Sequence, residues 1–297
     1  MSYKLTADQV ASFHENGFIG PFKLCSPEEM AVIRQQIEKE VINTPSSVYG
    51  FEKCPRDRHL DSRIVYDLFT HPTVRDRLTS LLGPDLLIWR SSFFFKPPGA
   101  PATVWHRANV FKEYVDNPIL ETNEPDNLFQ LTTWIALDEA TMENGCVQFI
   151  KGSHKEYYKT VITKPDDQLQ NFGNDKKGLM GYDVQVDFDL DESRLVNMEC
   201  QPGEFFIFDQ RTLHGSPPNA SAKRRMGVNF RAVQPHVKAY GHFLEDGKIE
   251  HFGRSWDLSR WGCILLSGKD TSGVNKIAEL PSGKGLGDLL QAPIAAS

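Results

Sequence analysis

Two histidines and one arginine of this 297-residue chain stand in contexts that could bind a metal ion and an anion. His106 follows a turn rich in Pro and Gly, and His214 directly follows an apolar run of residues. Imidazoles are common ligands of non-haem iron, and a guanidinium such as that of Arg225 can hold a carboxylate through two parallel hydrogen bonds. The three residues are therefore candidates for an iron site that also binds a dicarboxylic oxo-acid, provided that the fold brings these distant segments together.

The remaining histidines and the cysteines are interpreted as structural or surface residues. No other histidine stands at metal-ligand spacing from a partner, and the five cysteines include no Cys-x-x-Cys pair. An odd number of widely spaced cysteines indicates reduced thiols in a reducing compartment. The histidines set aside in this way are His14, His59, His71, His154, His236, His242 and His251.

Capping residues and short apolar runs predict the elements that must position the candidate site. Thr6 and Ser26 are predicted N-caps of two helices, the first of which ends at Gly17, and a third helix is predicted over 74–82. Beyond residue 86, short runs rich in Val, Ile, Phe, Thr and Trp alternate with turn residues, as in antiparallel sandwiches and barrels. These runs are 86–89, 92–96, 131–136, 147–150, 204–208 and 226–232.

The predicted fold class is mostly β with flanking helices, around a double-stranded β-helix core of the jelly-roll, cupin-like kind. One domain is expected over 1–297, because the chain shows no linker and no internal repeat. Its predicted parts are a helical region over about 1–85, the jelly-roll core over about 86–235 with an insertion at about 155–193, and a C-terminal segment over 236–297.

Composition excludes several classes of function. Lys and Arg number 33 against 39 Asp and Glu, for a formal charge of −6, which argues against a nucleic-acid partner. No apolar run approaches the roughly 20 residues of a membrane span, so no membrane partner is expected. The first residues lack the apolar stretch of a signal peptide, and a cytoplasmic location is predicted.

The sequence resembles the iron(II)/2-oxoglutarate-dependent oxygenases of the phytanoyl-CoA dioxygenase type, and among them the aliphatic halogenases of nonribosomal peptide synthesis. The resemblance covers nearly the whole chain up to about residue 269 and depends on many segments together. They are residues 5–9, 16–22, 26–30, 58–61, 82–84, 89–90, 105–106, 144–150, 181–183 and 225–227.

The resemblance implies roles for individual residues. It implies that iron(II) is held by His106 and His214, and that Arg225 binds the distal carboxylate of 2-oxoglutarate. Thr103 and Trp134 match further positions that help to bind this co-substrate.

A halide pocket is also implied by the resemblance. It would contain Ala108 and Thr132, with Arg231 near both the halide and the co-substrate. Strand packing remains the alternative interpretation for Thr132 and Trp134.

Ala108 determines which reaction the resemblance implies. Hydroxylases of this superfamily carry an acid two residues after the first histidine, and that acid completes the iron site. His106-Arg107-Ala108 instead matches the halogenase pattern, His-x-Ala or His-x-Gly. Alanine has no lone pair, so a chloride ion could supply both the missing ligand and the missing negative charge. Iron(II), 2-oxoglutarate, chloride and dioxygen are therefore the expected cofactors and co-substrates.

The leading hypothesis is chlorination of an unactivated aliphatic carbon on an aminoacyl group tethered to a peptidyl carrier protein, in natural-product biosynthesis. Three alternatives stay open: a halogenase of a free small molecule, a 2-oxoglutarate-dependent hydroxylase, and a non-catalytic jelly-roll binding protein. Asn109 and Glu113 depart from the halogenase pattern, and a carboxylate at position 113 would repel chloride unless it were paired or turned away. These departures concern the substrate more than the class of reaction.

Overall fold

The computed structural model describes residues 2–108, 118–163, 183–251 and 254–291. Its N-terminal part begins with two capped helices. The predicted caps are confirmed. Thr6 and Gln9 exchange hydrogen bonds between side chain and backbone at the start of the first helix, and Gly17 ends it with a φ of 86°. Ser26 and Glu29 form the same box before the second helix. The helices are α1 (Ala7–Asn16), α2 (Pro27–Ile37), α3 (Arg63–Thr70), α4 (Pro72–Leu82), α5 (Gly241–Asp246) and α6 (Leu286–Gln291).

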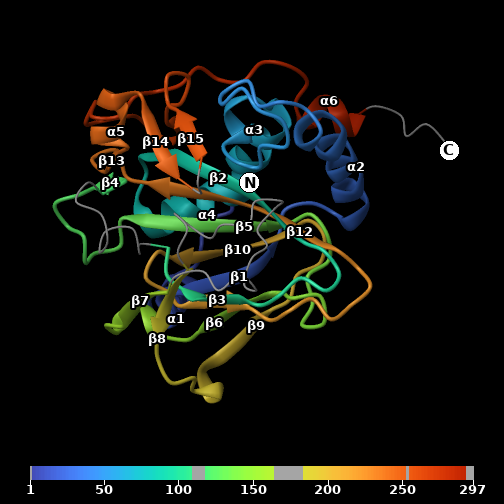
Figure 1. The fold of residues 1–297 in the computed structure, drawn as a ribbon, viewed down its shortest axis with the longest axis vertical. Coiled ribbons are helices and arrows are strands. Elements are labelled where there is room, and N and C mark those ends of the chain that lie inside the picture. The colour runs from blue at the N-terminus through green and yellow to red at the C-terminus, as the bar shows by residue number, and fades with distance from the viewer. Residues whose placement is uncertain (1, 109–117, 164–182, 252–253, 292–297) are drawn as a thin grey trace.

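Two antiparallel sheets form the centre of the fold (Figure 1). In the larger sheet the strand order is β1 (Phe18–Lys23), β10 (Glu204–Asp209), β5 (Gln130–Ala136), β12 (Arg225–Val233), β2 (Leu86–Lys96) and β16 (Ile264–Ser267). In the smaller sheet it is β3 (Thr103–His106), β11 (His214–Ser216), β6 (Val147–Ile150) and β9 (Leu195–Met198). Within the described part of the chain, two-stranded ribbons pair β4 (Leu120–Glu121) with β13 (Lys238–Ala239), β7 (Lys159–Thr163) with β8 (Asp183–Asp187), and β14 (Lys248–His251) with β15 (Arg254–Asp257).

The larger sheet lies between helices on one face and the smaller sheet on the other. Helix residues such as Met30 and Leu68 share one buried cluster with Phe230 of β12. A second cluster joins the sheets, where the ring of Phe149 on β6 lies 5.5 Å from that of Phe206 on β10. Burying apolar area on both faces of the larger sheet fixes its strands, and with them the side chains that they carry toward the smaller sheet.

The fold class expected from the sequence is confirmed at the level of mostly antiparallel strands with additional helices. The predicted runs 86–89 and 92–96 join into the single strand β2, and α3 was not predicted at all. The expected insertion contains the paired strands β7 and β8, and residues 164–182 between them lie outside the described part of the chain. Among the helices that are described, none has the length and apolarity needed to cross a membrane.

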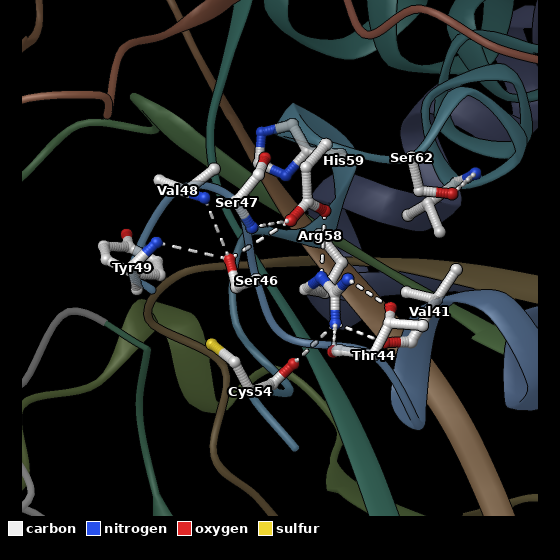
Figure 2. A network of polar contacts seen from close by, with 12 residues as sticks. Val41, Thr44, Ser46, Ser47, Val48, Tyr49, Cys54, Arg58, His59 and Ser62 are labelled. Atoms are coloured by element: carbon white, nitrogen blue, oxygen red, sulfur yellow. Dashed lines mark hydrogen bonds and ion pairs between the residues drawn. The ribbon is translucent and has the colours of Figure 1, made fainter. Parts of the chain in front are cut away.

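A buried arginine ties the segment after α2 to the segment before α3 (Figure 2). Nη1 of Arg58 donates to the carbonyl oxygens of Val41, Thr44 and Cys54, and Nε donates to Oδ1 of Asp61 at 2.9 Å. The side chains of Arg58 and Asp61 are only 3% and 4% exposed. Both charges of the pair are therefore satisfied inside the protein, where an unpaired charge would be costly.

We expect an Arg58→Met substitution to lower the free energy of unfolding by about 3–5 kcal/mol, because Asp61 would remain as an uncompensated buried charge. Urea unfolding measures the effect. The matched control is Arg63→Met, since Arg63 pairs with Asp67 through a side chain that is 42% exposed. That control should lose no more than about 1 kcal/mol. Equal losses in the two variants would contradict the structural role given to Arg58.

Candidate active site

The two candidate iron ligands, far apart in the sequence, lie directly opposite each other in the smaller sheet. His106 is the last residue of β3 and pairs with His214, the first residue of β11. Their ring centroids are 4.2 Å apart. The register between β3 and β11 therefore brings the two histidines side by side, as their predicted roles require.

Each imidazole is held in the form that a metal ligand needs. Nδ1 of His106 lies 2.8 Å from the carbonyl oxygen of Val104, and Nδ1 of His214 lies 2.9 Å from that of Thr212. A carbonyl can only accept, so both Nδ1 atoms carry the proton and both Nε2 atoms keep a free lone pair. Burial lowers the pKa of His106. Burial also lowers the pKa of His214 well below its usual value, and repulsion from a protonated His106 lowers it further. The pair is thus neutral and suited to bind iron(II).

Ala108, two residues after His106, is buried. Its backbone N–H donates to the carbonyl oxygen of Gln210 at 2.9 Å, which anchors it beside the segment that leads to His214. No cluster of three or more His, Cys, Asp or Glu side chains suited to a metal occurs among the described residues. Asn109 and Glu113, the two departures from the halogenase pattern, lie outside the described residues.

Two unsatisfied polar groups lie next to each other on the larger sheet. Arg231 on β12 pairs in register with Thr132 on β5. Nη1 of Arg231 and Oγ1 of Thr132 are buried and have no hydrogen-bond partner within the described residues. The positive charge of Arg231 also contributes to the lowered pKa of both His106 and His214. A guanidinium N–H and a hydroxyl left without partners next to two imidazoles suit an anion, because buried donors in native proteins are nearly always paired.

Arg225 lies at the opposite end of the same strand, in surroundings of its own. Its Nε and Nη2 donate to the carbonyl oxygen of Gly145 at 3.2 and 2.9 Å, and its guanidinium carbon lies 5.6 Å from the centroid of Trp134. Burial lowers the pKa of Arg225 to about 10. Gly227 makes this arrangement possible, because a Cβ there would collide with the Trp134 ring.

Lys96 is a functional candidate that the sequence did not single out. It pairs in register with Arg225, and its Nζ donates to Oγ of Ser216 at 2.8 Å. Ser216 in turn donates to Oγ1 of Thr103 at 2.9 Å. Burial, followed by the positive charge of Arg225, lowers the pKa of Lys96 to about 7. Two buried cations side by side repel each other, which makes their surroundings a site for a carboxylate. The only sequence signal is a lysine at the end of an apolar strand.

A cavity of about 350 Å³ adjoins Ala108. Among the described residues that line this cavity, Ala108 is the one that the sequence predicted as part of the site. Trp89 connects the cavity to the rest of the site, because the guanidinium carbon of Arg231 lies 5.9 Å from its ring centroid. The cavity therefore lies next to Ala108 and near Arg231, and Arg225 and Lys96 do not line it.

Comparison with known proteins assigns the chain to a family. Residues 13–227 match the model of the phytanoyl-CoA dioxygenase (PhyH) family. Dioxygenase lolE1 of Epichloe uncinata is 28% identical over 211 residues, which cover 69% of each protein. Ectoine dioxygenase of Bordetella parapertussis is 24% identical and covers 75% of this chain and 74% of its own. The chain therefore belongs to the phytanoyl-CoA dioxygenase family, within the superfamily of iron(II)- and 2-oxoglutarate-dependent oxygenases.

Solved structures agree with this assignment. The structure of CytC3 with Fe(II) and alpha-ketoglutarate superposes with a TM-score of 0.71 at 28% identity, over 95% of this chain and 96% of that one. EctD from S. alaskensis with bound Fe gives a TM-score of 0.57 at 18% identity, over 80% and 79% of the two chains, which shows the shared fold. Iron(II) and 2-oxoglutarate, the latter also called alpha-ketoglutarate, are thus the cofactor and co-substrate that the site would hold.

Proposed function

We propose that this protein is a halogenase, which replaces a hydrogen on an unactivated aliphatic carbon by chlorine. The observation that carries the proposal is the residue set around the two histidines. Ala108 offers no ligand, while Arg231 and Thr132 present buried donors without partners. A hydroxylase of this family would need a carboxylate here, whereas a halogenase would need space and donors for an anion.

Charge balance supports chloride as the missing ligand. The imidazoles of His106 and His214 are neutral, so the site with iron(II) and dianionic 2-oxoglutarate has an open ligand position and one negative charge fewer than in a hydroxylase, whose third protein ligand is a carboxylate. When bound, iron and its co-substrate would supply the oxidising power: dioxygen, 2-oxoglutarate, one chloride ion, one proton and the substrate C–H would give succinate, carbon dioxide, water and C–Cl. The Arg231 guanidinium and the Thr132 hydroxyl would hold the chloride, since both are desolvated donors.

Arg225 and Lys96 would bind the distal carboxylate of 2-oxoglutarate. The two cations are register partners, and Arg225 uses only two of its nitrogens on Gly145. A dicarboxylate held by a guanidinium fork and an ammonium gains charge-assisted hydrogen bonds and relieves the repulsion between them. Thr103, at the end of the hydroxyl chain from Lys96, and Trp134, beside Arg225, would complete this end of the site.

Lys96 makes the binding of 2-oxoglutarate dependent on pH. With a pKa of about 7 before the anion binds, most of the Lys96 population is neutral at pH 8. A bound carboxylate favours the ammonium and raises this pKa, so binding takes up protons and weakens as pH rises above 7, by up to about tenfold per unit. Calorimetry of the iron-loaded chain at pH 8, in two buffers of different ionisation enthalpy, measures the uptake. Lys96→Met should abolish it, and an absence of uptake in the wild type would contradict this role.

An anaerobic chloride titration tests the proposed function. Iron(II) and 2-oxoglutarate are added without dioxygen, and their visible charge-transfer band is recorded as chloride increases. We expect a saturable shift of the band, which places a halide on the iron. A normal band that is indifferent to chloride would indicate a hydroxylase, and iron that does not bind would leave only a non-catalytic role.

Two further predictions from the sequence belong to this proposal. We infer that the two sheets form a double-stranded β-helix, whose smaller sheet carries the two histidines and whose larger sheet carries Arg225 and Lys96. A tethered aminoacyl substrate and a free small molecule would use the same iron site. The residues around the iron do not discriminate between them, and the choice depends on the cavity beyond Ala108.

A further inference from the structure

The cavity beside Ala108 has an apolar interior of limited size. Its inner wall includes the buried side chains of Trp89, Ile119 and Phe129. Its volume of about 350 Å³ lies at the lower end of the range for small-molecule sites. An apolar wall in the cavity that Ala108 lines suits the aliphatic part of a substrate, and the volume favours a molecule of roughly amino-acid size.

A fixed amide donor reaches this interior. Nε1 of Trp89 donates to Oε1 of Gln130 at 3.0 Å, and because an indole can only donate, this contact determines which way the amide is turned. The contacts of Gln130 among the described residues use its Oε1 and its backbone N–H, which leaves Nε2 available on a side chain that lines the cavity. It can therefore donate to an acceptor on a bound molecule.

Opposite charges face each other at the outer part of the cavity. Glu121 on β4 pairs in register with Lys238 on β13, and both side chains line the cavity. Nζ of Lys238 lies 4.0 Å from Oε2 of Glu121, which is too long for a hydrogen bond. Their side chains are 41% and 40% exposed, so both groups can be reached from solvent. The two strands thus place one carboxylate beside one ammonium, with no hydrogen bond between them.

We propose that the substrate is a free aliphatic α-amino acid, bound as a zwitterion. This inference rests on the proposed function, because it takes the carbon that reacts to lie near Ala108. The ammonium of the amino acid would bind Glu121, its carboxylate would bind Lys238, and its side chain would lie along Trp89 and Phe129. An aminoacyl group on a carrier protein has the ammonium but no carboxylate, so it would leave Lys238 without a function in recognition. The structure therefore favours the free small molecule over the tethered substrate.

Calorimetry with defined amino acids tests the proposal. L-Norvaline, L-leucine and L-isoleucine are titrated into the full chain loaded with iron(II), 2-oxoglutarate and chloride, without dioxygen. At least one should bind, and its N-acetyl derivative and its methyl ester should each bind about ten- to a hundredfold more weakly, as expected when one charge-assisted hydrogen bond is lost. No binding by any of the three would overturn the proposal. A methyl ester that binds as tightly as the acid would overturn it too, in favour of a tethered substrate.

Substitutions at the two charges separate recognition from a merely structural effect. Glu121→Gln should weaken binding of the amino acid about ten- to a hundredfold and leave binding of the N-acetyl derivative unchanged. Lys238→Met should weaken binding of the amino acid by a similar factor and leave binding of the methyl ester unchanged. Loss of all compounds alike would indicate a structural role and contradict the proposal. Glu15→Gln is the matched control, because Glu15 forms an exposed ion pair with Lys155 elsewhere and should leave every affinity unchanged.

Failure of this inference is distinguishable from failure of the proposed function. The chloride-dependent shift of the iron band is recorded with no amino acid present, so it reports on the iron site alone. A normal shift together with no preference for the zwitterion would reject the amino-acid substrate and leave the halogenase proposal intact. Amino-acid binding without a chloride shift would reject the halogenase proposal and with it the reaction assumed here.

Discussion

An Ala108→Asp substitution is expected to abolish chlorination. The new carboxylate would stand two residues after His106, where it can bind iron(II) and supply the negative charge that chloride otherwise provides. The chloride-dependent shift of the charge-transfer band should disappear, while 2-oxoglutarate is still converted to succinate. Product analysis by mass spectrometry and the anaerobic titration measure the two effects. Ala108 is buried, so the added atoms could cost roughly 1–3 kcal/mol of stability, and thermal unfolding must be recorded alongside.

Ala108→Gly is the matched control for this substitution. Glycine also lacks a ligand, so the glycine variant should keep the chloride-dependent shift. Loss of chloride dependence in both variants would show that packing at position 108, and not the carboxylate, is responsible. Chlorinated product from Ala108→Asp at the wild-type rate would disprove the idea that chloride binds at the ligand position that Ala108 leaves open.

Substitution of Arg225 should have the second large effect, on the co-substrate. Arg225→Met removes the guanidinium that lies over Trp134 and leaves Lys96 as the remaining buried cation. We expect the concentration of 2-oxoglutarate needed for half-maximal turnover to rise by about a hundredfold or more, as is usual when one partner of a buried charge pair is deleted. Steady-state kinetics with varied 2-oxoglutarate measure the change.

The adjacent arginine provides a control in the same segment. Arg224 directly precedes β12 and pairs with Glu38 and Asp138. Arg224→Met should leave the 2-oxoglutarate requirement unchanged. A requirement that is unaffected by Arg225→Met, or raised equally by both variants, would mean that the distal carboxylate is bound elsewhere.

Local features of the fold were predictable because their causes are local. The caps at Thr6 and Ser26 depend on contacts three residues apart, and the structure confirms both helices that they begin. Most strand runs are likewise confirmed to within a residue or two, as at β5, β6 and β10. Helix α3 was not predicted although it is amphipathic and Ser62 caps it, because its eight residues give only two turns of the helical pattern.

The sequence by itself determined the chemical types at the candidate site: two histidines, an alanine in place of an acid, and arginines on one strand. These follow from the order of residues in short segments such as His106-Arg107-Ala108. It gave no sign that Lys96 stands beside Arg225, because that pairing depends on the register between β2 and β12. Register is set by how whole strands bury their faces, and a shift of one residue would turn each side chain to the other side.

Tertiary structure alone decided which polar groups are left without partners. The resemblance named Arg231 and Thr132 from the sequence, but only the fold shows that burial removes water from both and that the strand pairing places them opposite each other. The cavity between Trp89, Gln130 and Glu121 is likewise formed by segments distant in the chain. Desolvation and the lack of a partner are properties of the packed protein, so a sequence can name the groups but only the fold can make them a binding site.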